Sequence, residues 1–412
     1  MYNLGIHLFS LGVAVASHFN EKIKKMWQGE HEAFSILKAK ADPDTQYIWV
    51  HAASLGEFEQ GRPIIEHIKK EHPEQKVLLT FFSPSGYEVR KNYEGADIIT
   101  YLPLDTASNA CRFLSLIHVK MAFFIKYEFW YNYMHILKQQ GVPVYSISCI
   151  FRENQIFFRW YGKPYSKVLG CITHFYAQNE ESRLLLASIG LTNVTVTGDT
   201  RFDRVLQIKE AAKHLALVEK FITGNPSRVF VAGSSWQPDE DIFIRYFNEH
   251  KDWKVIIAPH VISEDHLQQI EKLLEGHRVV RYTEATSAKQ LDKADVLIIN
   301  CFGLLSSIYQ YGRVTYVGGG FGMGIHNVLE AAVWNVPVII GPNNKKFQEA
   351  QELMAAGGCF EITGYPDFEQ LMQRFQDDAL YLSEAGKRAG EYVKNRAGAT
   401  TDVLSQISNN PY

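Results

Sequence analysis

Cysteine is scarce in this sequence, and neither sign of charge is in clear excess. The five cysteines are an odd number, lie far apart and include no Cys-x-x-Cys pair, which argues against a disulfide framework and a structural zinc site. The 42 lysines and arginines are balanced by 45 aspartates and glutamates, so no global basic field points to a nucleic-acid partner. We therefore expect a protein of a reducing compartment that binds no nucleic acid.

Compact metal-binding motifs and the common dinucleotide motif are also missing from the sequence. The 15 histidines form no His-Glu-x-x-His or similar ligand spacing. The Asp-x-Asp sequence Asp42-Pro43-Asp44 precedes the first predicted strand, which is the wrong edge of a sheet for a ligand. The glycine-rich stretch after residue 317 does not fit Gly-x-Gly-x-x-Gly in any frame. We therefore expect no metal site and no cofactor.

The remaining composition is that of an ordinary globular protein. With 412 residues and 46% apolar residues, the chain is long enough for two or three domains. From residue 47 onward, short β-rich runs alternate with segments of helical spacing, which predicts parallel sheets with crossover helices. The predicted strands are 47–50, 77–82, 97–101, 121–125, 142–147, 172–177 and 194–196, followed by 229–232, 255–258, 296–299, 314–317 and 338–340. The predicted fold class is therefore α/β, with two doubly wound Rossmann-like domains that face each other across a cleft.

The first 20 residues contain no Asp, Glu, Lys or Arg and are followed by Lys22, Lys24, Lys25 and Trp27. Polar residues make this stretch a poor spanning helix, but its basic and aromatic flank suits a membrane surface. We expect a membrane-associating helix, and an ordinary core helix or a signal peptide stay open as alternatives. The expected divisions are a membrane-associating segment 1–30, a first domain 31–205, a linker 206–226, a second domain 227–380 and a helical tail 381–412 that returns to the first domain.

Ligands of open parallel sheets bind beyond the carboxyl ends of the strands, so residues that follow strands are the candidates. Glu57 follows the first strand and could be a general base or an ordinary acidic residue of a helix's first turn. Glu128, within Lys126-Tyr127-Glu128-Phe129-Trp130, is a second carboxylate with the same two interpretations. Arg201 could hold an anion or form an ion pair with a neighbouring aspartate.

In the second half, 318–324 holds five glycines in seven residues between a strand and a helix. Such a run allows close approach of the backbone to a phosphate, and Glu330 could then bind ribose hydroxyls. A loose surface loop is the alternative. Gly233-Ser234-Ser235 and Pro259-His260 also follow strands and belong to the same group of candidates.

Jointly, these motifs resemble the 3-deoxy-D-manno-octulosonic acid (Kdo) transferase family of lipopolysaccharide synthesis. The resemblance covers nearly the whole chain and is carried by 51–57, Tyr101-Leu102-Pro103-Leu104-Asp105, 128–132, 177–181, 196–203, Val317-Gly318-Gly319 and 326–332. It implies a GT-B fold and a metal-independent, inverting transfer of Kdo from CMP-Kdo to a lipid A precursor, lipid IVA. The acceptor would be bound by the first domain, 31–205, and CMP-Kdo by the second, 227–380. It also implies a location on the cytoplasmic face of the inner membrane, anchored through the N-terminus.

Residue by residue, the resemblance implies a catalytic role for Glu57 as the base, with Glu128 and Arg201 beside it. Arg201 stands where the family commonly has a lysine that stabilises transition-state charge. Three positions depart from the family: Lys126 replaces a glutamate, Leu304 replaces an acidic residue and His260 replaces an arginine. The implied CMP site consists of Pro259, His260, Phe302, Gly303, Leu304, Asn327, Val328, Leu329 and Glu330.

Other functions use the same kind of sheet and stay open from the sequence. A GT-B transferase or epimerase that uses another sugar nucleotide is the nearest alternative, because the fold does not choose the nucleotide. A dinucleotide-dependent oxidoreductase is opposed by the missing glycine motif. A non-catalytic protein that binds sugar nucleotides is the third alternative.

Overall fold

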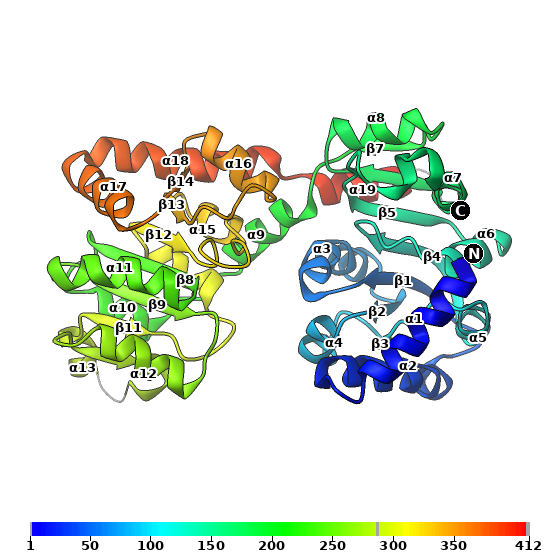
Figure 1. Cartoon of the computed structure of the whole chain (residues 1–412), viewed down its shortest axis with the longest axis horizontal. Coiled ribbons are helices and arrows are strands. Elements are labelled where there is room, and N and C mark those ends of the chain that lie inside the picture. Colours follow the sequence, from blue (N-terminus) through cyan, green and yellow to red (C-terminus); the bar gives the residue numbers. More distant parts are fainter. Residues whose placement is uncertain (1, 286–287, 409–412) are drawn as a thin grey trace. The chain divides into compact units, whose positions relative to one another are not determined.

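The chain forms two compact units, each built around one sheet of seven strands (Figure 1). The computed structural model describes residues 2–285 and 288–408. The first unit contains the described residues up to Arg204 and those from Ala397 onward, and the second contains Val205–Arg396. We describe each unit by itself.

The first sheet has the strand order β3-β2-β1-β4-β5-β6-β7, and its strands pair in parallel. The order reverses direction between β1 and β4, which makes their shared boundary the switch point of the sheet. The strands are β1 Gln46–Ala52, β2 Lys76–Phe81, β3 Ile98–Tyr101, β4 His118–Ile125, β5 Val144–Cys149, β6 His174–Ala177 and β7 Val194–Val196. The helices are α1 Tyr2–Ala16, α2 Glu21–Lys40, α3 Leu55–Glu71, α4 Pro84–Arg90, α5 Ala107–Ser115, α6 Tyr131–Gln139, α7 Lys163–Ser166, α8 Glu180–Ser188 and α19 Ala399–Ser408, with 3₁₀ turns η1 Ile156–Phe158, η2 Trp160–Gly162 and η3 Leu169–Cys171.

The second sheet has the order β10-β11-β9-β8-β12-β13-β14, again with parallel pairs. Its switch point lies between β8 and β12. The strands are β8 Val229–Ser235, β9 Lys254–Pro259, β10 Val279–Arg281, β11 Val296–Ile298, β12 Val314–Val317, β13 Val338–Ile340 and β14 Cys359–Glu361. The helices are α10 Ala216–Ile222, α11 Gln237–Glu249, α12 Glu264–Leu273, α13 Ala288–Lys293, α14 Leu305–Ile308, α15 Leu329–Ala332, α16 Gln348–Ala355, α17 Tyr365–Asp377 and α18 Ala379–Arg396, with 3₁₀ turns η4 Tyr282–Glu284 and η5 Tyr309–Tyr311.

The predicted α/β class with two doubly wound sheets is confirmed, and each of the twelve predicted strands is present. The central strands are buried along almost their whole length, because helices cover both faces of each sheet. The sequence analysis missed β10 and β14. Both have three residues, lie at the two edges of the second sheet and are only partly buried, so neither carries the long apolar run of a central strand.

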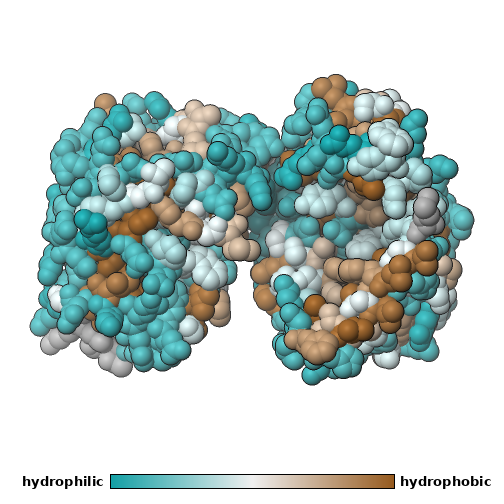
Figure 2. Space-filling model, in the orientation of Figure 1, coloured by the Kyte–Doolittle hydropathy of each residue, from teal (hydrophilic) through white to brown (hydrophobic). Residues whose placement is uncertain are grey.

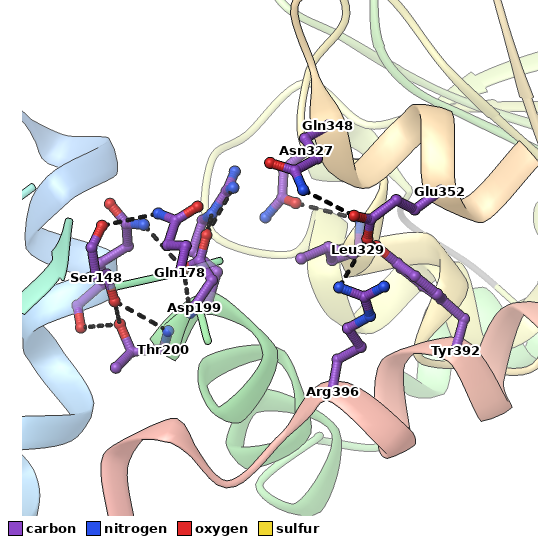
Figure 3. A network of polar contacts seen from close by, with 12 residues as sticks. Ser148, Gln178, Asp199, Thr200, Asn327, Leu329, Gln348, Glu352, Tyr392 and Arg396 are labelled. Carbon is purple, nitrogen blue, oxygen red and sulfur yellow. Dashed lines mark hydrogen bonds and ion pairs between the residues drawn. The ribbon is translucent and has the colours of Figure 1, made fainter. Parts of the chain in front are cut away.

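The segments between and after the sheets differ from the predicted divisions. The predicted linker 206–226 is largely helical, since it contains the end of α9 (Thr200–Glu210) and all of α10, and it groups with the second unit. Of the predicted tail, α18 also groups with the second unit, where Glu352 accepts a hydrogen bond from Tyr392 and forms an ion pair with Arg396 (Figure 3). The first unit regains the chain from Ala397 onward, and there Asp203 accepts backbone bonds from Gly398 and Thr400.

The N-terminal stretch forms α1, and α1 is attached to the first unit at its own N-terminal end. Tyr2 donates a hydrogen bond to Asp105 Oδ2 at 2.7 Å, and Asn132 Nδ2 donates to Asn3 Oδ1 at 2.8 Å. Asp105 also accepts the backbone N–H groups that open α6. Across the described residues, we find no helix with the length and apolar character needed to cross a membrane.

Helix α2 carries a buried acid, Glu30, next to Leu104. The Glu30 side chain on α2 accepts a hydrogen bond from the Leu104 N–H through Oε2, at a long 3.4 Å. Its other oxygen, Oε1, is buried with no hydrogen-bond partner among the described residues. Burial raises the pKa of Glu30 to about 8, so the carboxyl is held mostly protonated at neutral pH.

We expect this carboxyl to weaken the fold as pH rises. Because its folded pKa lies above the unfolded value, folding binds a proton, and stability falls between about pH 4.5 and pH 8. Glu30→Gln should abolish that fall and exceed the native free energy of unfolding by several kcal/mol at pH 9, as measured by denaturant unfolding. Glu32→Gln, at an exposed position of the same helix, is the control. Parallel pH profiles for the native chain and Glu30→Gln would show that the Glu30 carboxyl is ionised in the fold.

Candidate active site

The predicted carboxylates of the first unit lie at the switch point of its sheet. Glu57 is in the first turn of α3, directly after β1, whereas Lys126 and Glu128 follow β4. Because β1 and β4 are parallel neighbours, their carboxyl ends lie at the same edge. The structure therefore brings together residues that are about 70 positions apart in the sequence.

Glu57 is held by the start of its own helix. The Ser54 N–H donates to Glu57 Oε2 at 2.9 Å, and Ser54 Oγ lies 3.2 Å from the same oxygen. This reciprocal arrangement is a capping box, in which the third helical residue satisfies the N-cap backbone. The other oxygen, Oε1, makes no hydrogen bond to a described residue. The interpretation as a first-turn acid is thus confirmed, and one oxygen is left for a ligand.

Burial and like charge act together on Glu57. Burial is the larger cause and raises its pKa, and the carboxylate of Glu128 raises it further. Lys126, His51 and the hydrogen bond from Ser54 oppose this rise. A carboxylate whose pKa is moved toward neutrality is a better proton acceptor than an ordinary surface glutamate. Lys126 itself has a left-handed backbone, with φ of 62°, which is strained for a residue other than glycine.

A buried histidine supports this edge, and the sequence analysis did not assign it a role. Trp130 Nε1 donates to His51 Nε2 at 3.3 Å, and His51 Nδ1 lies 2.8 Å from Thr80 Oγ1. Since an indole N–H can only donate, the neutral ring carries its proton on Nδ1 and donates it to Thr80. Glu128 Oε2 is 3.8 Å from His51 Nε2. The available signal was a polar residue within the apolar run of β1.

Arg201 forms the ion pair that was one of its two interpretations. Its Nε and a terminal nitrogen each lie 2.8 Å from Asp199 Oδ2, and Gln60 Nε2 donates to Oδ1 of the same carboxylate. Asp199 is buried, yet the charge of Arg201 holds its pKa below the usual value. Close by, Thr200 is bonded to Ser148 at the end of β5 (Figure 3). A role of Arg201 in transition-state charge stays a prediction.

The predicted nucleotide residues lie at one edge of the second sheet. They follow β9, β11 and β12, and β8 separates β9 from β12 in the same sheet. Glu330 Oε1 accepts from Asn327 Nδ2 at 3.1 Å, and its other oxygen accepts from Ser306 Oγ. The Val328 and Leu329 side chains are fully buried in the core, so only their backbone groups can contact a ligand. Pro259 ends β9, and 302–304 precede α14, with Phe302 largely exposed.

The glycine run serves mainly to bring backbones together. A Cβ at Gly318 would lie 2.3 Å from Ser234 O, and one at Gly320 would lie 2.6 Å from Gly341 Cα. The Gly318 N–H donates to Gly233 O, and the Gly319 N–H donates to Asp239 Oδ2. The N–H groups of Gly322 and Gly324 both donate to Gly319 O. These four amides are already bonded, so the expectation that the glycine amides form an open phosphate cradle is wrong for them.

Three aromatic rings from neighbouring elements lie at the same edge, and only one of them was predicted. His260 stacks on Trp236 with ring centroids 4.6 Å apart and on His326 at 4.4 Å, with interplanar angles of 24° in both cases. Trp236 Nε1 donates to His326 Nε2 at 3.2 Å. In the sequence analysis, His326 appears only as part of the 326–332 motif. The one sequence feature that could have singled out Trp236 is its position directly after β8.

Comparison with known proteins identifies the class of this chain. It is similar to the UDP-GlcNAc 2-epimerase of Neisseria meningitidis bound to UDP-GlcNAc, with a TM-score of 0.62, 15% identity and coverage of 88% of this chain and 100% of that one. At that identity the likeness concerns the fold alone. The two parallel sheets with their structural neighbours define the GT-B fold, as predicted.

Sequence comparison narrows this class. Residues 26–204 match the model of the family described as 3-deoxy-D-manno-octulosonic-acid transferase. The Kdo transferase of Aquifex aeolicus is 28% identical over 322 residues, covering 76% of this chain and 82% of that protein. The Bordetella pertussis enzyme is 26% identical over 382 residues, with coverages of 87% and 86%. The predicted resemblance to the Kdo transferase family is thereby confirmed, and the chain is a glycosyltransferase.

Since Glu57 combines a cap with a buried charge, its two neutral variants should differ in stability. Glu57→Gln keeps an acceptor for the Ser54 N–H and removes a buried charge beside Glu128. We expect its free energy of unfolding to match or exceed the native value at pH 8, with any gain lost at low pH, where Glu57 is protonated. Glu57→Ala loses the acceptor and should be less stable than Glu57→Gln by about 1 kcal/mol in denaturant unfolding. Equal stability of the two variants would argue against the capping role.

Proposed function

We propose that this chain transfers Kdo from CMP-Kdo to a lipid A precursor, lipid IVA, with inversion at the anomeric carbon. The observation that carries the proposal is Glu57, a buried carboxylate with one open oxygen at the switch point of the first sheet. The family resemblance and the names of the relatives support Kdo as the group transferred. The pair of sheets supports a nucleotide-linked donor.

In this proposal Glu57 acts as the general base. An acceptor hydroxyl becomes a stronger nucleophile when Oε1 of Glu57 takes its proton as the hydroxyl attacks the anomeric carbon. The capping box fixes Oε2, so the carboxylate cannot rotate freely away from the hydroxyl. Glu128 keeps the proton affinity of Glu57 high, and Lys126 limits that effect so that the base stays available at neutral pH.

The second unit is proposed to hold CMP as the leaving group. When the bond between the anomeric carbon and the phosphate oxygen breaks, the electron pair stays on that oxygen, and the phosphate passes from one negative charge to two. Glu330, positioned by Asn327 and Ser306, is suited to accept hydrogen bonds from ribose hydroxyls. CMP leaves readily, so the chemistry demands no metal.

The direct test is turnover of CMP-Kdo with lipid IVA. Glu57→Gln keeps size and hydrogen bonding but loses basicity, so turnover should fall by about 100-fold or more. Affinity for CMP, measured by calorimetry, should barely change. Glu71→Gln, at the exposed end of the same helix, is the matched control. Near-native turnover by Glu57→Gln would exclude it as the base, and a larger melting shift with UDP than with CMP would favour another sugar nucleotide.

The same assay carried out against pH separates a base from a merely structural acid. A base must be ionised, so kcat/KM should fall as pH drops through the pKa of Glu57. Glu128→Gln removes the like charge that raises this pKa and should move the acid limb of the profile to lower pH. An acid limb that stays in place in Glu128→Gln would contradict the coupling between the two carboxylates.

The acceptor is a lipid, so we also propose that the first unit binds the cytoplasmic surface of the inner membrane. Leu4, Leu8, Leu11 and Val15 follow the spacing of one helical stripe on α1, and all four are more than half exposed. Figure 2 shows apolar side chains gathered along the path of α1. A second exposed stretch of this unit mixes aromatic and basic residues: Arg152, Arg159, Trp160, Tyr161, Lys163, Tyr165 and Lys167.

Polar residues on the α1 stripe should release the protein from lipid. The triple variant Leu4→Gln, Leu8→Gln, Leu11→Gln leaves the buried contacts of Tyr2 and Val13 in place. We expect it to bind vesicles that contain anionic lipid at least tenfold more weakly in sedimentation, because exposed leucines contribute by burial in the interface. Binding by the native chain should also weaken with salt.

A matched control uses exposed apolar residues elsewhere on the first unit. Val89→Gln and Leu184→Gln change comparable side chains on α4 and α8. Both should sediment with vesicles as the native chain does. Equal sedimentation of the triple variant and the native chain would exclude α1 as the membrane contact, and the aromatic and basic stretch would be the next candidate.

A further inference from the structure

The contacts among the three rings of the second unit indicate which ring nitrogen of His326 carries a hydrogen. Trp236 is the N-cap of α11, His260 directly follows β9, and His326 follows the glycine run. Because Trp236 Nε1 donates to His326 Nε2, the neutral His326 ring carries its proton on Nδ1. The His260 ring stacks on the rings of Trp236 and His326, and His260 is exposed to solvent. Two imidazoles are thus held face to face at an open edge of the sheet.

The charges around these rings favour neutral imidazoles in the free protein. Burial and the neighbouring His260 lower the pKa of His326 to about 4, and burial also lowers the pKa of His260. From α11, the Asp239 carboxylate accepts from the Trp236 and Gly319 N–H groups and from Tyr316. Glu240 from α11 is bonded to Ser235 and to His266 from α12, and Glu330 from α15 to Ser306 and Asn327. Each of these carboxylates is already bonded to other groups.

Fixed positive charge is scarce beside the rings. A pocket of about 210 Å³ opens here, and none of its lining residues is a lysine or an arginine: Trp236, Pro238, Asp239, Gly319, Phe321, Gly322, Met323, Gly324 and His326. Four glycine amides of the loop are bonded within the chain. Helix α15 has only four residues and offers little dipole.

We propose that the phosphate of CMP binds here together with a proton, which His260, stacked on Trp236 and His326, takes up from solvent. This rests on the proposed function, because CMP is the leaving group of the proposed transfer. A phosphate dianion attracts an imidazolium and offsets the repulsion that keeps the free rings neutral. The phosphate gains its second charge only when the donor bond breaks. Proton uptake therefore follows the product more than the donor, and it makes retention of CMP depend on pH.

Calorimetry on the full chain tests this directly. CMP is titrated at pH 7.5 in two buffers of different ionisation enthalpy, because free CMP is a dianion there, with a second phosphate pKa of about 6. We expect the observed enthalpies to differ by an amount that corresponds to uptake of up to one proton. Affinity should fall by up to about tenfold per pH unit above pH 7. Cytidine, which has no phosphate, should bind without proton uptake.

Two variants locate the proton, and a third is the control. His260→Arg supplies a permanent charge, so it should bind CMP with less than half of the native proton uptake and keep its affinity at pH 8. His260→Gln cannot take a proton, so it should also lower the uptake and should weaken CMP binding. His214→Gln changes a histidine outside the stack and should behave as the native chain does.

The outcomes separate this inference from the function it rests on. Binding of CMP by the native chain with equal enthalpies in both buffers would overturn the proton uptake and leave the Kdo transfer untouched. Full native uptake in both His260→Arg and His260→Gln would place the proton elsewhere and also overturn the inference. A chain that binds neither CMP nor cytidine would overturn the proposed function, and this inference with it.

Discussion

Parallel strand pairing is the constraint on which the rest of the molecule depends. A chain that leaves one strand of a parallel pair must cross the face of the sheet before it can begin the next strand, so the turns that follow the strands gather at one edge. Every strand pair formed by the described residues is parallel. Polar residues with no proximity in sequence, such as Glu57 and Glu128, are therefore brought together by topology alone.

That edge is also where the backbone is strained. Lys126, Ser148 and Ser234 have positive φ angles without being glycines, and they lie at the carboxyl ends of β4, β5 and β8. Each such residue costs on the order of 1–3 kcal/mol, which the buried strands beside it must offset. The strain places Lys126 near two carboxylates whose repulsion it moderates. At Lys126 the strained backbone thus coincides with a cluster of charged side chains.

The sequence predicts the central strands well because they are long apolar runs, and it predicts which turns matter because parallel topology is a general rule. It does not predict β10 and β14, since three half-buried edge residues carry no periodic signal. The predicted linker 206–226 fails to stand out as a separate segment for a related reason. Its Gly-Asn-Pro turn marks the start of a strand, whereas the helices before it pack with the second unit.

The sequence pattern could not predict which side chains form hydrogen bonds and ion pairs with each other in the site. The motif around Arg201 was compatible with an anion clamp or an ion pair, and only the geometry shows that Nε and a terminal nitrogen of Arg201 contact Asp199. His51 is a single letter within a strand until Trp130 and Thr80 are seen on either side of its ring. Hydrogen-bond partners depend on tertiary contacts, which a single sequence does not contain.

The glycine run 318–324 was singled out from the sequence, but the phosphate-binding role predicted for its amides does not hold for the four that are bonded within the chain. Its composition is typical of a loop that presents amides to a phosphate, but glycines also allow two backbones to touch, and here Gly318 and Gly320 lie against Ser234 and Gly341. Once four of the amides are bonded internally, the charge of an anion has to be balanced by side chains. A guanidinium would balance it at any pH, whereas an imidazole balances it only by binding a proton. In the proposal made above, His260 therefore supplies a charge that forms only with the bound ligand, whereas an arginine would carry a permanent one.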